Sequence, residues 1–174
     1  MELYPKRVFQ RQLKLQAEFI IISSEQINSA LKERDVTKVF YSIQNFLNAS
    51  ANIAKCLFGS GGRKCAQRKS LRESIGVDEN SPFKNVSARN NFEHMDERID
   101  RWWGESRRHN LCDLNITPAG FIQGFETVEW FRNFDPETTD ITFFSEKFNL
   151  QEIVDEVQRI YPKLQEEAGK PHWE

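Results

Sequence analysis

The chain has 174 residues and a formal net charge of −2 at neutral pH. Its length is sufficient for one domain with a hydrophobic core of its own, without disulfides or a structural metal. The near-neutral charge excludes a protein that holds nucleic acid by its global charge, so contacts to phosphate must come from local basic patches.

Cysteine usage and hydropathy indicate the compartment. The three cysteines, Cys56, Cys65 and Cys112, form no C-x-x-C pair, and an odd number without such a pair is typical of a reducing environment. The sequence shows no basic-then-apolar signal with a cleavage site and no apolar run of transmembrane length. We therefore expect a cytoplasmic protein with no membrane partner.

Two long helices are predicted over residues 5–58. Apolar residues recur at three- and four-residue spacing up to about Arg34, and the run Phe19–Ile22 is typical of a buried helix centre. Asp35 is placed to cap the second helix, and Gly59 is placed to end it. A tight connection between two long helices favours an antiparallel hairpin, the start of a bundle.

Residues 59–82 are predicted to form a basic loop followed by a short helix. The stretch from Gly59 to Ser70 has three glycines and four basic residues: Arg63, Lys64, Arg68 and Lys69. One interpretation is a strap that contacts RNA phosphates. The other is a solvated surface loop, which is the commoner meaning of a run of charges.

A further helix is predicted over residues 83–104, with Gly104 as its end. Five apolar residues of this helix share one stripe: Phe92, Met95, Ile99, Trp102 and Trp103. His94 falls on the opposite side, whereas a histidine that filled the core would lie on the stripe. The two tryptophans have the shape to stack bases, but their place on the stripe favours core or dimer packing. Arg107 and Arg108 form a second basic cluster beyond the helix.

The last third of the chain predicts a β-hairpin and a final helix. β-Branched and aromatic residues flank a polar turn, Asp135–Asp140, within residues 125–146. Asn149 is placed to cap a helix over residues 149–167, and Pro162 is expected to kink or end it. The whole chain, residues 1–174, is therefore predicted to be one mainly α domain with a small β-hairpin inserted before its last helix.

The hexapeptide Arg89-Asn90-Asn91-Phe92-Glu93-His94 resembles the R-x4-6-H signature of the HEPN superfamily, in which a polar residue often follows the arginine. HEPN proteins are small antiparallel helical bundles that usually dimerise, and many are metal-independent RNases. The resemblance implies a HEPN-like bundle with Arg89, Asn90 and His94 as its site residues, and it implies no metal and no cofactor.

These residue types suit cleavage of RNA. The imidazole of His94 can take the proton of the 2′-hydroxyl or give one to the leaving 5′-oxygen, and the guanidinium of Arg89 matches phosphate oxygens. Asn90 can orient the imidazole or bind the phosphate. The expected products carry a 2′,3′-cyclic phosphate and a 5′-hydroxyl. The alternative is a surface histidine without a catalytic role, on a helix that is stabilised by a Glu97–Arg101 pair.

One histidine does not readily serve as both base and acid, and an isologous dimer would supply a second copy of the pair. We therefore expect a homodimer with a composite site, and an endoribonuclease that acts as a toxin or antiviral defence effector with an antitoxin or defence-system partner protein. The alternatives are a non-catalytic HEPN-like module for dimerisation or for binding nucleotides or a partner, and a structural protein in which the motif is accidental. A zinc site at Cys56, Cys65, His109 and Cys112 is a minor alternative, because its spacing is unusual.

Overall fold

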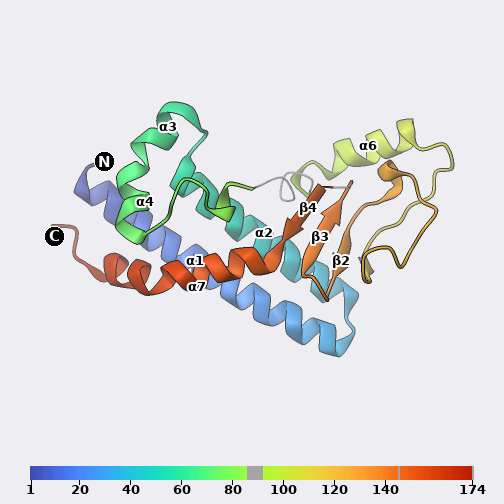
Figure 1. Ribbon diagram of the computed structural model, residues 1–174, viewed down its shortest axis with the longest axis horizontal. Helices are drawn as coiled ribbons and strands as arrows, with labels where there is room; N and C mark the ends of the chain where they lie inside the picture. The colour runs from blue at the N-terminus through green and yellow to red at the C-terminus, as the bar shows by residue number, and fades with distance from the viewer. Residues whose placement is uncertain (86–91, 145, 174) are drawn as a thin grey trace.

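The computed structural model describes residues 1–85, 92–144 and 146–173, and it is mainly helical with a small sheet before the last helix. Figure 1 shows an elongated molecule in which the long helices run from one end to the sheet, and helix α6, Met95–Glu105, lies at the other end beyond the sheet. None of the described helices combines the length and the apolar composition that crossing a membrane requires.

The predicted helical hairpin is present. Helix α1, Leu3–Glu33, and helix α2, Val36–Phe58, run antiparallel and make the largest contact between elements in the fold. Asp35 caps α2 as expected, since its carboxylate accepts a hydrogen bond from the backbone N–H of Lys38 at 3.0 Å. Arg34 turns the chain between the helices with a left-handed backbone, φ 58°.

The expectation that Phe19–Ile22 is a buried helix centre is wrong for two of its four residues. Ile20 is fully buried, but Phe19 and Ile22 are 42% and 49% exposed. Successive residues of a helix are turned by about 100°, so a run of four points to every side of the helix. Only the side that faces the rest of the chain is covered.

Residues 59–70 are not a simple loop, which corrects the prediction for this segment. Helix α3, Gly62–Gln67, and helix α4, Lys69–Ile75, follow a turn at Gly59. Gly59 has φ +61°, and a Cβ there would lie 2.7 Å from the Cβ of Lys64. Glycine therefore allows the chain to fold α3 back against the end of α2.

The predicted helix over residues 83–104 is not one continuous element. A 3-10 turn spans Pro82–Lys84, and helix α6 spans only Met95–Glu105. His94 precedes α6 with a backbone outside the helical region (φ −101°, ψ 41°). Gly104 does not end α6, because the first residue beyond it is Ser106. The part of the helix prediction that falls on residues 86–91 lies outside the described part of the chain.

The predicted β-hairpin is part of a larger sheet. Strand β2, Asn133–Asp135, pairs antiparallel with β3, Asp140–Phe143, with Phe134 opposite Ile141. Two further strands extend this sheet. Strand β4, Glu146–Asn149, is antiparallel to β3 and was not predicted. Strand β1, Asn115–Ile116, is parallel to β2, and only its residue Ile116 lies in the stretch Ile116–Gly124 that the sequence left open as a third short strand or a loop. A 3-10 turn, Thr127–Glu129, precedes β2.

Helix α7, Leu150–Gly169, closes the fold along α1. Asn149 caps it, since its side chain accepts from the backbone N–H of Glu152 at 3.0 Å. Pro162 was expected to kink or end the helix; it does not end it, because α7 runs on for seven residues to Gly169. The packing of α7 against α1 outweighs the one backbone hydrogen bond that proline removes.

A single core joins the hairpin, the short helices, the sheet and α7. Its largest fully buried side chains come from α1, α2, α4, the turn at Pro82–Lys84 and the sheet: Leu13, Ile20, Ile43, Phe46, Leu47, Ile53, Leu57, Leu71, Ile75, Phe83 and Ile141. No residue of α6 is buried, so α6 lies outside this core.

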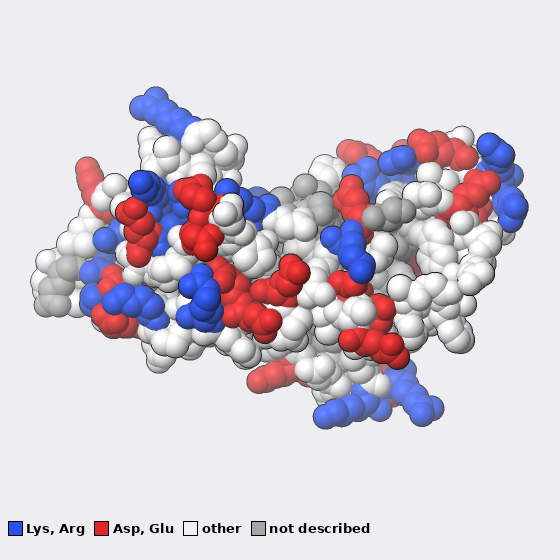
Figure 2. Space-filling view, in the orientation of Figure 1, with Lys and Arg blue, Asp and Glu red and all other residues white. Residues whose placement is uncertain are grey.

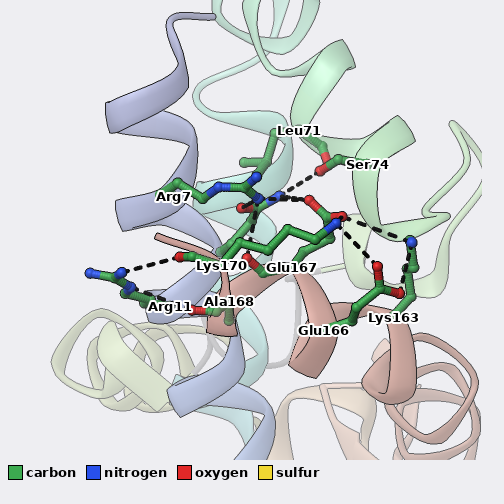
Figure 3. Close-up of polar contacts among 10 residues, drawn as sticks. Arg7, Arg11, Leu71, Ser74, Lys163, Glu166, Glu167, Ala168 and Lys170 are labelled. Carbon is green, nitrogen blue, oxygen red and sulfur yellow. Dashed lines mark hydrogen bonds and ion pairs between the residues drawn. The ribbon is translucent and has the colours of Figure 1, made fainter. Parts of the chain in front are cut away.

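Polar groups also join the start of α1 to the end of α7 inside the protein (Figure 3). The guanidinium of Arg7 donates to the Glu167 carboxylate at 2.7 Å and to Gln10 Oε1 at 2.9 Å. Lys170 also pairs with Glu167, and Gln10 donates to Ser74 of α4 at 2.9 Å. We call this set the α1–α7 ion network.

Candidate functional site

His94 lies at the surface, at the start of α6. Its side chain is 51% exposed, and its Nδ1 lies 3.2 Å from Oε1 of Glu97, which is 62% exposed. A carboxylate next to Nδ1 accepts a hydrogen bond from the N–H group of that nitrogen and so favours the tautomer in which Nε2 carries the lone pair. Within the described part of the chain, no polar group makes a hydrogen bond to Nε2.

Glu97 is a residue whose role the sequence did not reveal. The sequence paired it with Arg101, but the structure places its carboxylate on His94 and pairs Arg101 with Glu105 at 3.1 Å. Arg101 also lies over the ring of Phe144, 5.7 Å from its centroid. The i,i+3 spacing of His94 and Glu97 was the available signal, because residues three apart are neighbours on a helix.

The other two residues of the signature, Arg89 and Asn90, lie outside the described residues. Their positions relative to His94 are therefore predictions from the sequence. Phe92, two residues before His94, is buried and packs against Phe143 of the sheet with ring centroids 5.9 Å apart. This contact fixes the chain just before α6 to the core.

A buried carboxylate fixes the other end of α6. Glu129 has no exposed surface and accepts hydrogen bonds from the Ser106 hydroxyl at 2.7 Å and from the backbone N–H groups of Glu126 and Asn110 at 2.9 Å and 3.2 Å. The N–H of Glu126 and the hydroxyl of Ser106 hold the pKa of Glu129 below its usual value. Trp102 adds a hydrogen bond from Nε1 to the carbonyl of Asn110 at 2.7 Å. Helix α6 is thus held at both ends while its middle faces solvent.

The apolar stripe of α6 is less covered than expected. Ile99 and Trp103 are 47% and 63% exposed, so they are not core residues in this chain. The ring of Trp103 packs on His109 at a centroid distance of 4.3 Å, and Nε2 of His109 lies 3.2 Å from the carbonyl of Trp103. The stripe therefore leaves aromatic surface available beside α6.

The basic residues proposed to bind RNA have different surroundings. Arg63 and Lys64 are exposed on α3. Arg68 is half-buried, with its guanidinium 3.8 Å above the ring of Phe9, so it packs against α1 instead of facing a ligand. Lys69 is exposed, 3.8 Å from Glu73.

The second basic cluster follows α6. The backbone N–H of Arg107 donates to Glu126 at 3.2 Å, and Nη1 of Arg108 donates to the carbonyl of Gly124 at 3.2 Å. Both arginines are exposed. They lie beyond the far end of α6 from His94, and an 11-residue helix is about 16 Å long. His94 and this cluster thus do not form one compact site.

Charge on the face shown in Figure 2 is mixed, with Lys and Arg side chains interspersed among Asp and Glu. Among the described residues, no group of three or more His, Cys, Asp or Glu side chains is arranged to hold a metal ion. Burial raises the pKa of the thiols of Cys56 and Cys112, which makes them poor nucleophiles and poor metal ligands. The zinc alternative therefore has no support in the described geometry.

Comparison of the chain with protein-family models, with curated proteins and with solved structures finds no match.

Proposed function

We propose that this chain is a metal-independent endoribonuclease in which His94 transfers the proton. The observation that supports this proposal best is the exposed imidazole of His94, whose Nδ1 lies 3.2 Å from the Glu97 carboxylate. That arrangement suits a general base for a substrate that arrives from solvent.

The proposed reaction uses the nucleophile that RNA carries. Nε2 of His94 takes the proton of a 2′-hydroxyl, and the 2′-oxygen attacks the adjacent phosphorus. The bond from phosphorus to the 5′-oxygen breaks, and that oxygen receives a proton from a second imidazole. Arg89 neutralises charge that develops on the phosphate, and Asn90 binds the phosphate or orients His94. The products end in a 2′,3′-cyclic phosphate and a 5′-hydroxyl.

Glu97 has a positioning role in this proposal. The carboxylate fixes the orientation of the His94 ring, so that Nε2 is the atom that takes the proton. Both side chains are more than half exposed, so solvent screens the pair and its contribution is modest.

The second imidazole would come from a second copy of the chain, in a homodimer with a composite site. A toxin or antiviral effector of this kind would be controlled by an antitoxin or a defence-system partner protein. A monomeric form that cleaves RNA at the full rate would refute the composite site.

Cleavage of labelled RNA in the presence of a chelator tests the reaction directly. We expect wild-type protein to leave 2′,3′-cyclic phosphate and 5′-hydroxyl ends, and His94→Ala and Arg89→Ala to abolish cleavage. His172→Ala is the matched control, since His172 is also exposed but lies after α7, and it should retain activity. RNA left intact by pure wild-type protein would overturn the proposal.

The alternative is a non-catalytic module of the same architecture that dimerises or binds a nucleotide or a partner protein. Two observations favour this alternative over a nuclease that binds RNA through a broad basic surface. The charge on the face shown in Figure 2 is mixed, and Arg68 packs on the ring of Phe9. Binding of RNA or nucleotide without cleavage, unchanged by His94→Ala, would support it.

A further inference from the structure

The end of α6 carries a cluster of aromatic rings in which one ring faces solvent. Trp102 is partly buried and lies edge-on to the core residue Phe131, with ring centroids 6.4 Å apart. Trp103 is 63% exposed, and its ring centroid lies 4.3 Å from that of His109. The sequence favoured core or dimer packing for both tryptophans, but only Trp102 packs toward the core. Trp103 therefore leaves much of a large flat ring exposed.

Buried groups hold this exposed ring in place. The hydroxyl of Ser106 donates to the buried Glu129 carboxylate and accepts a hydrogen bond from the backbone N–H of His109 at 2.8 Å. His109 has a left-handed backbone with φ 50°, a conformation that residues with a side chain adopt rarely. Its Nε2 lies 3.2 Å from the carbonyl oxygen of Trp103. Because these contacts fix the ring before a ligand arrives, binding to it costs little conformational entropy.

Two exposed arginines, Arg107 and Arg108, lie next to this ring. The contact between Trp103 and His109 brings the chain segment that carries both of them beside the indole. Figure 2 shows Lys and Arg side chains at this tip of the molecule, where the chain leaves α6 in Figure 1. Within the described residues, neither guanidinium lies within ion-pair distance of a carboxylate. We call Trp103, Arg107, Arg108 and His109 the aromatic–arginine patch.

The chemistry of the patch matches that of a single-stranded nucleic acid. Proteins bind unpaired strands with aromatic side chains, on which the bases stack, and with cations that contact the phosphates. A duplex does not expose the faces of its bases, so it cannot stack one of them on the indole. An apolar protein partner would cover two guanidinium groups without a counter-charge, which is unfavourable. An acidic peptide would pair with the arginines but would leave the ring of Trp103 unused.

We propose that the aromatic–arginine patch binds single-stranded RNA, with one unpaired base stacked on Trp103 and adjacent phosphates at Arg107 and Arg108. This inference deepens the proposed function, because it names unpaired RNA as the substrate class. It rests on the proposed function in one respect, which is the choice of RNA over DNA, since the proposed reaction uses a 2′-hydroxyl.

The patch lies apart from the phosphate that would react at His94. Trp103 follows His94 by nine positions, which corresponds to about 13 Å along α6 and about half a turn around it. The base on Trp103 is therefore several nucleotides away from the bond that breaks. The patch contributes to affinity and to the choice of unpaired RNA, and it takes no part in proton transfer. Its loss should raise KM for RNA cleavage and leave kcat unchanged.

Binding of a labelled oligonucleotide tests the proposal without any need for cleavage. The probe is a fluorescein-labelled 2′-O-methyl RNA of about ten nucleotides, which is within the site size of proteins that bind single strands. Methylation removes the attacking hydroxyl, so wild-type protein can be used. Fluorescence anisotropy should show that Trp103→Ala raises Kd by about tenfold, because one base loses its stacking partner. Trp103→Phe should retain most of the affinity.

The arginines have a separate signature. The double variant Arg107→Gln/Arg108→Gln should raise Kd and also make binding less sensitive to salt. The slope of the logarithm of the binding constant against the logarithm of salt concentration should become smaller in magnitude by about 1.4, the value for two phosphates of a single strand. A role of the two arginines that is only structural would not change this slope.

Trp173→Ala is the matched control, because Trp173 is 69% exposed and lies after α7, and it should bind the probe like wild-type protein. The probe annealed to its complement should bind about tenfold more weakly than the single strand, since no base is free to stack. If Trp103→Ala is folded by circular dichroism and binds the probe like wild type, or if the duplex binds as well as the single strand, the proposal is wrong. Wild-type protein that does not bind the probe would also overturn it and would leave a protein as the ligand of the patch.

Cleavage of unmethylated RNA separates this inference from the proposed nuclease. If wild-type protein cleaves RNA but Trp103→Ala changes neither KM nor the Kd of the probe, only the inference fails. If the probe binds through Trp103 but wild-type protein leaves RNA intact, the inference stands and only the nuclease fails.

Discussion

The α1–α7 ion network and the surroundings of His94 use the same kinds of side chain for opposite purposes. Arg7 and Glu167 are 4% and 8% exposed and are joined at 2.7 Å, with Lys170 and Gln10 beside them (Figure 3). His94 and Glu97 are 51% and 62% exposed and are joined at 3.2 Å. Because the first pair is buried, we expect it to stabilise the fold, whereas the exposed second pair is accessible to molecules in solution.

The same contrast holds for apolar packing. Helix α2 contributes many side chains to the core, whereas α6 has none that is buried and is held mainly at its two ends. Regions with few buried contacts open more easily and are where binding sites are often found. From this difference we expect that the long helices supply most of the stability of the fold and that substitutions on the surface around α6 have little effect on folding.

The largest expected effect comes from a matched pair of Phe→Ala variants. Phe46 of α2 is fully buried and Phe121, between α6 and β2, is 78% exposed. Phe46→Ala should lower the free energy of unfolding by about 4 kcal/mol, because it leaves a cavity in the core. Phe121→Ala should change it by less than about 0.5 kcal/mol. Urea denaturation of both variants measures the difference, and equal effects would contradict the distinction between the long helices and the surface around α6.

Removal of Arg7 should have the next largest effect. Arg7→Ala removes the buried cation of the network and leaves the Glu167 carboxylate with the partly exposed Lys170 and Lys163, and we expect a loss of about 3 kcal/mol in the free energy of unfolding. Lys14→Ala breaks the partly exposed Lys14–Glu18 pair on the same helix and should cost less than about 1 kcal/mol. A loss as small for Arg7→Ala as for this control would mean that the network does not stabilise the fold.

Acid should weaken the same network. Burial alone would raise the pKa of Glu167, but hydrogen bonds from Lys170 and Arg7 outweigh burial and lower this pKa from 4.5 to about 2. A carboxyl whose pKa is lower in the folded state stabilises the fold above its unfolded pKa, and this contribution is lost as pH falls from about 4.5 toward 2.

We expect Glu167 to account for about 2 kcal/mol of the acid-induced loss, after allowance for screening by solvent. The free energy of unfolding, measured by urea denaturation at pH 6, 4 and 3, should therefore fall less with decreasing pH for Glu167→Gln than for wild-type protein. Glu166→Gln is the control, because Glu166 is exposed. If the free energy of unfolding fell equally with pH for Glu167→Gln and wild type, the α1–α7 ion network would not be the cause of the acid-induced loss.

Sequence patterns predicted the covered parts of the fold well and the uncovered parts poorly. The α1–α2 hairpin and the caps at Asp35 and Asn149 were predictable, because apolar spacing and cap chemistry act locally. The outward position of Phe19 and Ile22 was not, since a run of apolar residues does not tell which side lacks a covering element. Strand β4 was missed, and strand or loop was left open near β1, because these strands are four and two residues long and are fixed by pairing with other segments of the chain.

The candidate site was predictable only in part. The sequence predicted that His94 is exposed, and it is, although the residue precedes α6 and does not lie on the continuous helix from which the prediction was made. The partner of His94 was not predictable, because Glu97 had a plausible i,i+4 partner in Arg101, and only the structure shows that Arg101 turns to Glu105 and Phe144. Arg68 likewise counted as a free cation in the sequence, whereas its stacking on Phe9 depends on how α3 and α4 pack against α1.

The smallest effect on folding is expected from Glu97→Gln. This variant is also the most direct test of the exposed His94–Glu97 pair. Because Glu97 is 62% exposed, this change should alter the free energy of unfolding by less than about 0.5 kcal/mol. If Glu97 positions His94 during RNA cleavage, loss of its charge should lower kcat by about fivefold, which corresponds to the roughly 1 kcal/mol that an exposed ion pair contributes at most. KM should not change, since the carboxylate acts on the imidazole and not on the RNA. Glu105→Gln breaks an equally exposed pair on the same helix and should leave kcat unchanged, so an equal fall in both variants would mean that Glu97 acts only through the general charge of α6.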